Sequence, residues 1–188
     1  MSQSLLLQLA RDSIQEVLEA QNSIDRDTLL KQYPVLHEKI SSYVTLWLDQ
    51  EVRACAGRFF AQNSLLEDII HNAKIAAFQD PDATPLSTSE YLHCKLELSL
   101  LTPPELLQFS SLESLYDQIE AGRHGLALQE GEQLRVFLPY RWQHYPDKKS
   151  FVHALIASMP RSRSQKFYRF ECESAISPAI IKEKENNV

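Results

Sequence analysis

Residues 41–57 read SSYVTLWLDQEVRACAG and predict an antiparallel β-hairpin. Apolar side chains alternate with polar or aromatic ones along 43–48, which is typical of a half-buried strand. The LDQE segment is typical of a tight turn, and EVRACAG is expected to be the returning strand. Alternation places Arg53, Cys55 and Gly57 on one face of that strand. The hairpin therefore raises the question of whether Cys55 is a reactive thiol or a small core residue.

Helices are predicted on both sides of this hairpin. Residues 4–20 carry an apolar helical stripe that includes Val17, with Arg11 on the polar side. The SLLE segment at 64–67 matches a capping box, in which serine and glutamate side chains each accept the other residue's backbone N–H. The helix that it opens is expected to end near Asp80, because a proline follows.

The second half of the chain predicts two more helices. One begins with a capping box at Ser110 and Glu113 and ends before Gly122, and the other, DKKSFVHALIASMP, is stopped by Pro160.

Strands are predicted at 91–101, at 125–139 as a pair around a turn, and at 166–175. In the first of these, Glu97 lies on the polar face with His93 and Lys95. Strands interspersed with helices, without strict βαβ alternation, indicate an α+β fold with a largely antiparallel or mixed sheet flanked by helices.

The composition excludes several classes of protein. The chain has 188 residues and a formal charge of −6, whereas a general nucleic-acid binder needs a basic face, and only RSRSQK at 161–166 is locally basic. No segment approaches the roughly 20 apolar residues that cross a bilayer. Three cysteines without a CxxC pair indicate neither a disulfide framework nor a zinc site, and they favour a reducing cytoplasm. No Walker, GxGxxG, GxSxG or HExxH motif occurs, so we predict no cofactor and no metal.

The order of several segments resembles a known family. LLLQLARDSI, SSYVTLWLDQEVRACAG, LLEDIIHNAKIAAFQDPDATPLSTSEY, LELSLLTPPE and SLESLYDQIEAGRHGLAL follow one another with the spacing of the AMMECR-type domain, also called AmmeMemoRadiSam system protein A. The resemblance covers residues 5–175, and five ordered blocks are far more specific than one short match.

The resemblance implies a two-lobed α+β domain over residues 1–175, with both chain ends in the larger lobe. The composition of residues 176–188 predicts a loose C-terminal tail. The resemblance also implies a functional cleft between the lobes, and a cytoplasmic protein associated with a radical S-adenosylmethionine (radical-SAM) enzyme and a Memo-type protein. The family has no established biochemical activity.

The family's characteristic segment is Leu-Arg-Gly-Cys-Ile-Gly, and VRACAG at 52–57 matches it with Ala54 in place of the first glycine. The segment DPDA at 80–83 keeps the family's Asp-Pro but lacks the Arg-Phe that usually follows, and FLPYRWQHY departs from Leu-Pro-Gln-Val. If the lost residues line a ligand cleft elsewhere in the family, these departures imply a different ligand or none.

Two hypotheses about function remain open. In the first, Cys55 is a thiolate nucleophile or redox residue, assisted by Arg53. In the second, which we favour because of the departures, the chain is a non-catalytic binding or accessory module and the Arg/Cys strand is structural. The expected ligand-binding residues are Gly57, Asn72, Asp80 and Glu97. For Asn72 and Asp80 the alternative is an Asx-type interaction that ends the helix, and for Glu97 it is a solvated strand face.

Overall fold

The computed structural model describes residues 3–159 and 165–181 of the chain. The described residues divide into two compact units: the first comprises the chain up to Leu100 and from Ser174 onward, and the second comprises Leu101–Glu173. Each unit contains helices and a four-stranded antiparallel sheet, so the α+β class is confirmed. Along the described ranges, no helix is both long and apolar enough to cross a membrane.

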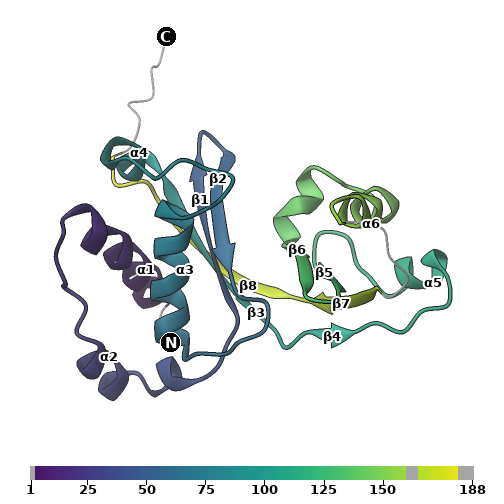
Figure 1. Cartoon of the computed structure of the whole chain (residues 1–188), viewed down its shortest axis with the longest axis horizontal. Helices are drawn as coiled ribbons and strands as arrows, with labels where there is room; N and C mark the ends of the chain where they lie inside the picture. Colours follow the sequence, from purple (N-terminus) through teal and green to yellow (C-terminus); the bar gives the residue numbers. More distant parts are fainter. Residues whose placement is uncertain (1–2, 160–164, 182–188) are drawn as a thin grey trace, which may run out of the picture. The chain divides into compact units, whose positions relative to one another are not determined.

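The first unit is a sheet covered by helices on one face (Figure 1). Its strands lie in the order β2-β1-β3-β8. The elements are α1 (Gln3–Leu18), α2 (Arg26–Gln32), a 3-10 helix η1 (Pro34–His37), β1 (Ser42–Leu48), β2 (Glu51–Gly57), α3 (Leu65–Phe78), α4 (Thr88–His93), β3 (Lys95–Leu101) and β8 (Cys172–Ser177).

The predicted hairpin is confirmed as β1 and β2. Its two turn residues, Asp49 and Gln50, have φ angles of 49° and 66°, as a two-residue turn between twisted strands requires. Leu46 pairs with Ala54, but Trp47 pairs with Val52, so Arg53 is the extra residue of a β-bulge. The alternation expected for β2 therefore fails at Val52, which is aligned with Trp47 across the strands.

Helix α3 packs against the hairpin, and α1 packs against α3. Val44, Leu46 and Ala54 project from the sheet into the same core as Ile69 of α3, and each is almost completely buried. Burying a side chain the size of Val or Leu contributes roughly 1.5–3 kcal/mol, so this layer carries much of the stability of the unit.

The capping box expected at the start of α3 is only half formed. Ser64 accepts the backbone N–H of Glu67, but the Glu67 carboxylate pairs with Arg26 at 3.1 Å. An ion-pairing partner on α2 thus replaces the reciprocal contact that the sequence pattern predicts.

Helix α1 is confirmed, with two exceptions to its expected faces. Val17 is 45% exposed, whereas Arg11 is buried. The Arg11 guanidinium donates to Ser177 Oγ and to the carbonyl oxygens of Cys94 and Pro178. A position that periodicity assigns to solvent therefore fixes the end of β8 to the helix layer.

The strand expected at 91–101 begins later than predicted. Residues 91–93 belong to α4, which begins with a complete capping box between Ser87 and Glu90. This cap outweighs the alternating pattern, and β3 starts at Lys95.

In the second unit, a sheet and helices also enclose a shared hydrophobic core (Figure 1). Its strands lie in the order β4-β7-β5-β6. The elements are β4 (Glu105–Leu106), α5 (Leu112–Tyr116), β5 (Gly125–Glu130), β6 (Gln133–Phe137), a 3-10 helix η2 (Pro139–Gln143), α6 (Lys148–Ala157) and β7 (Lys166–Phe170). The predicted pair of strands around residues 130 and 131 is confirmed.

Two predictions for this half of the chain need correction. The capping box of α5 lies one residue later than expected, between Ser111 and Ser114. The last predicted strand is two strands, β7 and β8, which belong to different sheets. The predicted stop at Pro160 and the tail beyond Ile181 lie outside the described residues.

Candidate functional site

The β-bulge at Arg53 places Cys55 on the face of the first sheet that points away from α3. A two-residue turn without a bulge would align Cys55 with Val44 on the core side, whereas here Cys55 pairs with Thr45. Thr45 also pairs with Glu97 on β3. A thiol, a hydroxyl and a carboxylate therefore stand in one row across three strands.

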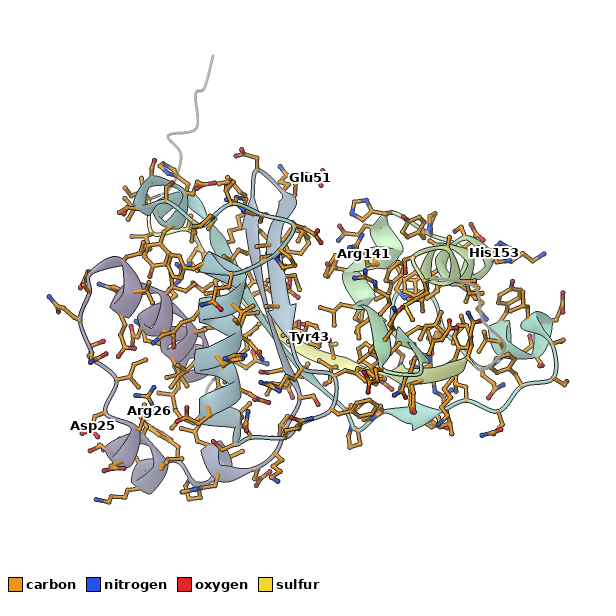
Figure 2. All side chains as sticks on the ribbon, viewed as in Figure 1. Asp25, Arg26, Tyr43, Glu51, Arg141 and His153 are labelled. Carbon is orange, nitrogen blue, oxygen red and sulfur yellow. The ribbon has the colours of Figure 1, made fainter. Side chains whose placement is uncertain are left out.

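We call this surface the polar face of the first sheet. The strand register places its residues on the same side of the sheet as Thr45. They are Tyr43, Thr45, Trp47, Cys55, Gly57, Lys95, Glu97 and Ser99. Figure 2 shows Tyr43 on β1 and Glu51 at the turn end of the same hairpin.

The Cys55 thiol is half-buried and lies 3.2 Å from the Thr45 hydroxyl, within a hydrogen bond. Thr45 itself is fully buried. The Cys55 backbone N–H donates to the Asp80 carboxylate at 3.1 Å. The thiol is thus positioned by a neutral side chain, and its backbone by a charged one.

Arg53, the residue expected to activate this thiol, forms hydrogen bonds with Glu90 and Thr84. Its Nε donates to Glu90 at 2.9 Å, and a terminal nitrogen donates to the Thr84 carbonyl at 2.9 Å and to the Thr84 hydroxyl at 3.2 Å. Hydrogen bonds from Ser87 and from Arg53 lower the pKa of Glu90 to about 2. The guanidinium therefore balances a carboxylate that stays ionised, and it links β2 to α4.

Asp80 fastens the loop after α3 to β2. One carboxylate oxygen accepts from Cys55, and the other accepts the backbone N–H of Asp82 at 2.9 Å. The expected Asx-type interaction is therefore present, in addition to the longer-range contact with Cys55.

Asn72 has a different environment from the one predicted. It lies inside α3, which continues to Phe78, so it does not end the helix. The side chain is buried and donates to the Ser42 carbonyl and hydroxyl, both at 3.0 Å. These bonds tie α3 to the start of β1 on the core side of the sheet.

A glycine is required at position 57 because neighbouring atoms lie where a Cβ would be, and not because of its backbone angles. A Cβ at this position would clash with the Tyr43 ring and lie 2.6 Å from the Ser42 carbonyl oxygen. The glycine lets Tyr43 lie flat against β2.

Glu97 is buried on the polar face, with 8% of its surface exposed. One carboxylate oxygen accepts from the Trp47 indole N–H at 2.8 Å, and the other accepts from the Ser99 hydroxyl at 3.3 Å. The alternative of a solvated strand face is therefore wrong for Glu97.

The structure brings together only part of the predicted site. Cys55, Gly57 and Glu97 share the polar face, Asp80 reaches its edge, and Asn72 lies on the opposite side of the sheet. Within the described ranges, no group of three or more His, Cys, Asp or Glu side chains could hold a metal ion.

Sequence reasoning missed Thr45 and Glu90, the direct partners of Cys55 and Arg53. The signal for Glu90 was the STSE segment at 87–90, which has the serine and glutamate spacing of a capping box. Thr45 could have been identified as the partner of Cys55 only by predicting the position of the β-bulge.

The fold and site define an α+β protein of two antiparallel sheets, one of which carries an outward row of polar side chains. The family model AMMECR1 matches residues 7–175, and the chain belongs to that family.

Two relatives are similar to this chain in sequence. Protein MK0488 of Methanopyrus kandleri is 34% identical over 137 residues, a match that covers 71% of this chain and 65% of that protein. Protein MJ0810 of Methanocaldococcus jannaschii is 30% identical over 155 residues, with 77% of each chain covered.

A solved structure shows the same fold. The crystal structure of the uncharacterised protein PH0010 from Pyrococcus horikoshii matches with a TM-score of 0.80 at 28% identity, over 93% of this chain and 94% of that one.

Proposed function

We propose that this protein is a non-catalytic binding or accessory module and that the polar face of its first sheet contacts the ligand. The observation that carries the proposal is the pairing of Arg53 with Glu90. A reactive cysteine needs a cation or a general base beside it, and here the expected cation is held by another side chain. The hydroxyl of Thr45 offers the thiol no charge.

We further propose that the module acts in the cytoplasm beside a radical-SAM enzyme and a Memo-type protein. The family resemblance supports this association. The inter-lobe cleft implied by the resemblance stays a prediction, and the proposal depends only on residues of the first unit.

The proposal is tested by capturing partners from the protein's own host with a tagged full-length chain, followed by mass spectrometry. Charge reversal at Lys95, which is exposed on the polar face, is expected to change the capture. Reversal at Lys149, an exposed lysine on α6, is the matched control. Cys55→Ser is expected to leave capture and stability nearly unchanged.

Two results would contradict this proposal. If Lys95→Glu and Lys149→Glu captured partners equally well, the polar face would not be the contact surface. If neither a radical-SAM enzyme nor a Memo-type protein were captured by the wild-type chain, the proposed association would be wrong.

The second candidate is a cysteine-dependent enzyme in which Cys55 is a thiolate nucleophile or redox residue assisted by Arg53. The observation in its favour is that the thiol is only half-buried and hydrogen-bonded to a hydroxyl. Selective alkylation near neutral pH separates the two proposals, with Cys172, also half-buried, as the reference. An enzyme requires that Cys55 react clearly faster than Cys172, and a binding module does not.

A further inference from the structure

We infer that the polar face binds an organic cation with N–H donors, an alkylammonium or guanidinium group, and that the Glu97 carboxylate is its anionic partner. The inference rests on the proposed function, because it names the chemistry of the ligand that the same face would take.

Among the residues that the structure describes, Glu97 differs from the other buried acids in having no basic partner. Among the described residues three acidic side chains are buried: Glu16, Asp68 and Glu97. Glu16 pairs with Lys74 at 2.9 Å, and Asp68 lies 3.5 Å from Arg58. Over residues 3–159 and 165–181, no lysine, arginine or histidine forms an ion pair with Glu97.

The groups that contact Glu97 are neutral donors. Trp47 donates through its indole N–H, and Ser99 donates through its hydroxyl, which also lies 2.7 Å from the Ser174 hydroxyl. These contacts fix the orientation of the carboxylate without neutralising it. Buried charges in proteins are usually paired, so the described residues leave this carboxylate without the cation that would usually accompany it.

The carboxylate keeps unused acceptor positions for such a cation. An ionised carboxylate offers about four acceptor positions, and only two of them are used here. The residue directly across on β1 is Thr45, a neutral hydroxyl that does not compete for the site. An incoming N–H donor with a positive charge would form the charge-assisted bond that the protein does not supply.

The two tryptophans of the chain provide a direct test. The Trp47 indole N–H donates to Glu97, whereas the Trp142 indole N–H donates to the His124 carbonyl in the second unit. Each gives its own indole N–H resonance in a proton–nitrogen NMR spectrum of the full-length protein. Trp47 therefore reports on the site, and Trp142 serves as an internal control.

The titration uses butylammonium and methylguanidinium chlorides at constant ionic strength, with 1-butanol as the neutral probe. We expect a saturable shift of the Trp47 resonance with at least one cation, no saturable shift with butanol, and little change at Trp142. Glu97→Gln keeps the shape of the side chain but removes its charge, and it should weaken the binding by roughly tenfold or more. Glu51→Gln, which removes an exposed carboxyl at the turn end of the β1–β2 hairpin, should bind as the wild-type protein does (Figure 2).

Two results would overturn the inference: no saturable shift with either cation in the wild-type protein, or equal binding by Glu97→Gln. If Glu97→Gln does not fold, the comparison of cations with butanol in the wild-type protein still decides. N-acetyl-lysine amide and N-acetyl-arginine amide identify the source of the cation. Binding of either amide supports a basic side chain of a partner protein, and binding of the simple cations alone supports a small molecule.

The outcome is separable from that of the proposed function. If the host partners are captured but no cation shifts Trp47, the binding module stands and the inference about Glu97 is wrong. If a cation binds but capture does not depend on the polar face, the inference about Glu97 stands and the proposed contact between the polar face and the partners is wrong.

Discussion

The Asp80 carboxylate accepts the backbone N–H of Cys55 at 3.1 Å, which joins the loop after α3 to the strand that carries the family's characteristic segment. The bond involves the backbone of Cys55 and leaves its thiol to Thr45. Asp80 therefore positions the backbone of Cys55.

Replacing Asp80 with alanine is expected to destabilise the protein by about 1–3 kcal/mol, because two backbone N–H groups lose a charged acceptor. Urea denaturation monitored by circular dichroism measures the loss. Asp82→Ala is the matched control, since only the backbone of Asp82 takes part in this contact. Equal stabilities of the two variants would show that the Asp80 bond contributes nothing.

The ion pair between Arg53 and Glu90 predicts a specific dependence of stability on pH. Glu90 has its pKa lowered from an ordinary 4.5 to about 2, chiefly by the Ser87 N–H and then by Arg53. A lowered pKa in the folded state stabilises the protein above pH 4.5, and this stabilisation is lost as the pH falls toward 2. The difference in free energy of unfolding between wild type and Glu90→Gln should therefore be largest near neutral pH and shrink across that interval.

Urea denaturation at several pH values between neutrality and pH 3 measures this difference. Glu132→Gln, at an exposed position in the β5–β6 turn, is the control for the general effect of removing a carboxylate. A difference for Glu90→Gln that stays constant as the pH falls would be inconsistent with the contact.

Gly57→Ala is expected to destabilise the protein by about 1–3 kcal/mol through overpacking. The new methyl group would meet both the Tyr43 ring and the Ser42 carbonyl oxygen. Adding Tyr43→Ala should restore only part of the loss, because the carbonyl contact remains. Thermal denaturation of the two single variants and the double variant completes a double-mutant cycle with the wild-type protein. Full additivity of the two losses of stability would argue against the ring contact.

Cys94 should be the last of the three cysteines to react with iodoacetamide in the native protein. It is 1% exposed, and burial raises the pKa of its thiol from 9.0 to about 11. That difference alone reduces the thiolate fraction about a hundredfold near neutral pH. Peptide mass spectrometry of a time course gives the three rates, with a sample unfolded in guanidinium as the control. Native labelling of Cys94 at the rate of Cys172 would contradict the burial.

The elements with strong local signals could be predicted from the sequence. The β1–β2 hairpin, α1, α3 and the β5–β6 hairpin follow from periodicity and turn residues. The β3 prediction was too long because the complete box at Ser87 and Glu90 extends a helix into an alternating segment. The split between β7 and β8 was not predictable from alternation, since the pattern continues through Glu171 with no turn residue.

The candidate site was harder to predict because it depends on one inserted residue. Counting back from the Asp49–Gln50 turn pairs Thr45 with Ala54, whereas the bulge at Arg53 pairs it with Cys55. A shift of one residue exchanges the two faces of a strand, so the bulge decides whether the thiol faces the core or the polar face. The partner of Arg53 could not be inferred either, because Glu90 lies 37 positions away along the chain.

The contacts of Asp80 and Arg53 also bear on how the protein avoids self-association. Strand β2 is at the end of the sheet order, where unpaired backbone groups can recruit a strand from another molecule. The Asp80 carboxylate occupies one such N–H, and Arg53 holds the Thr84 loop nearby. Asp80 and Arg53 thus protect the edge of the sheet against pairing with a strand of another molecule, and this role requires no substrate.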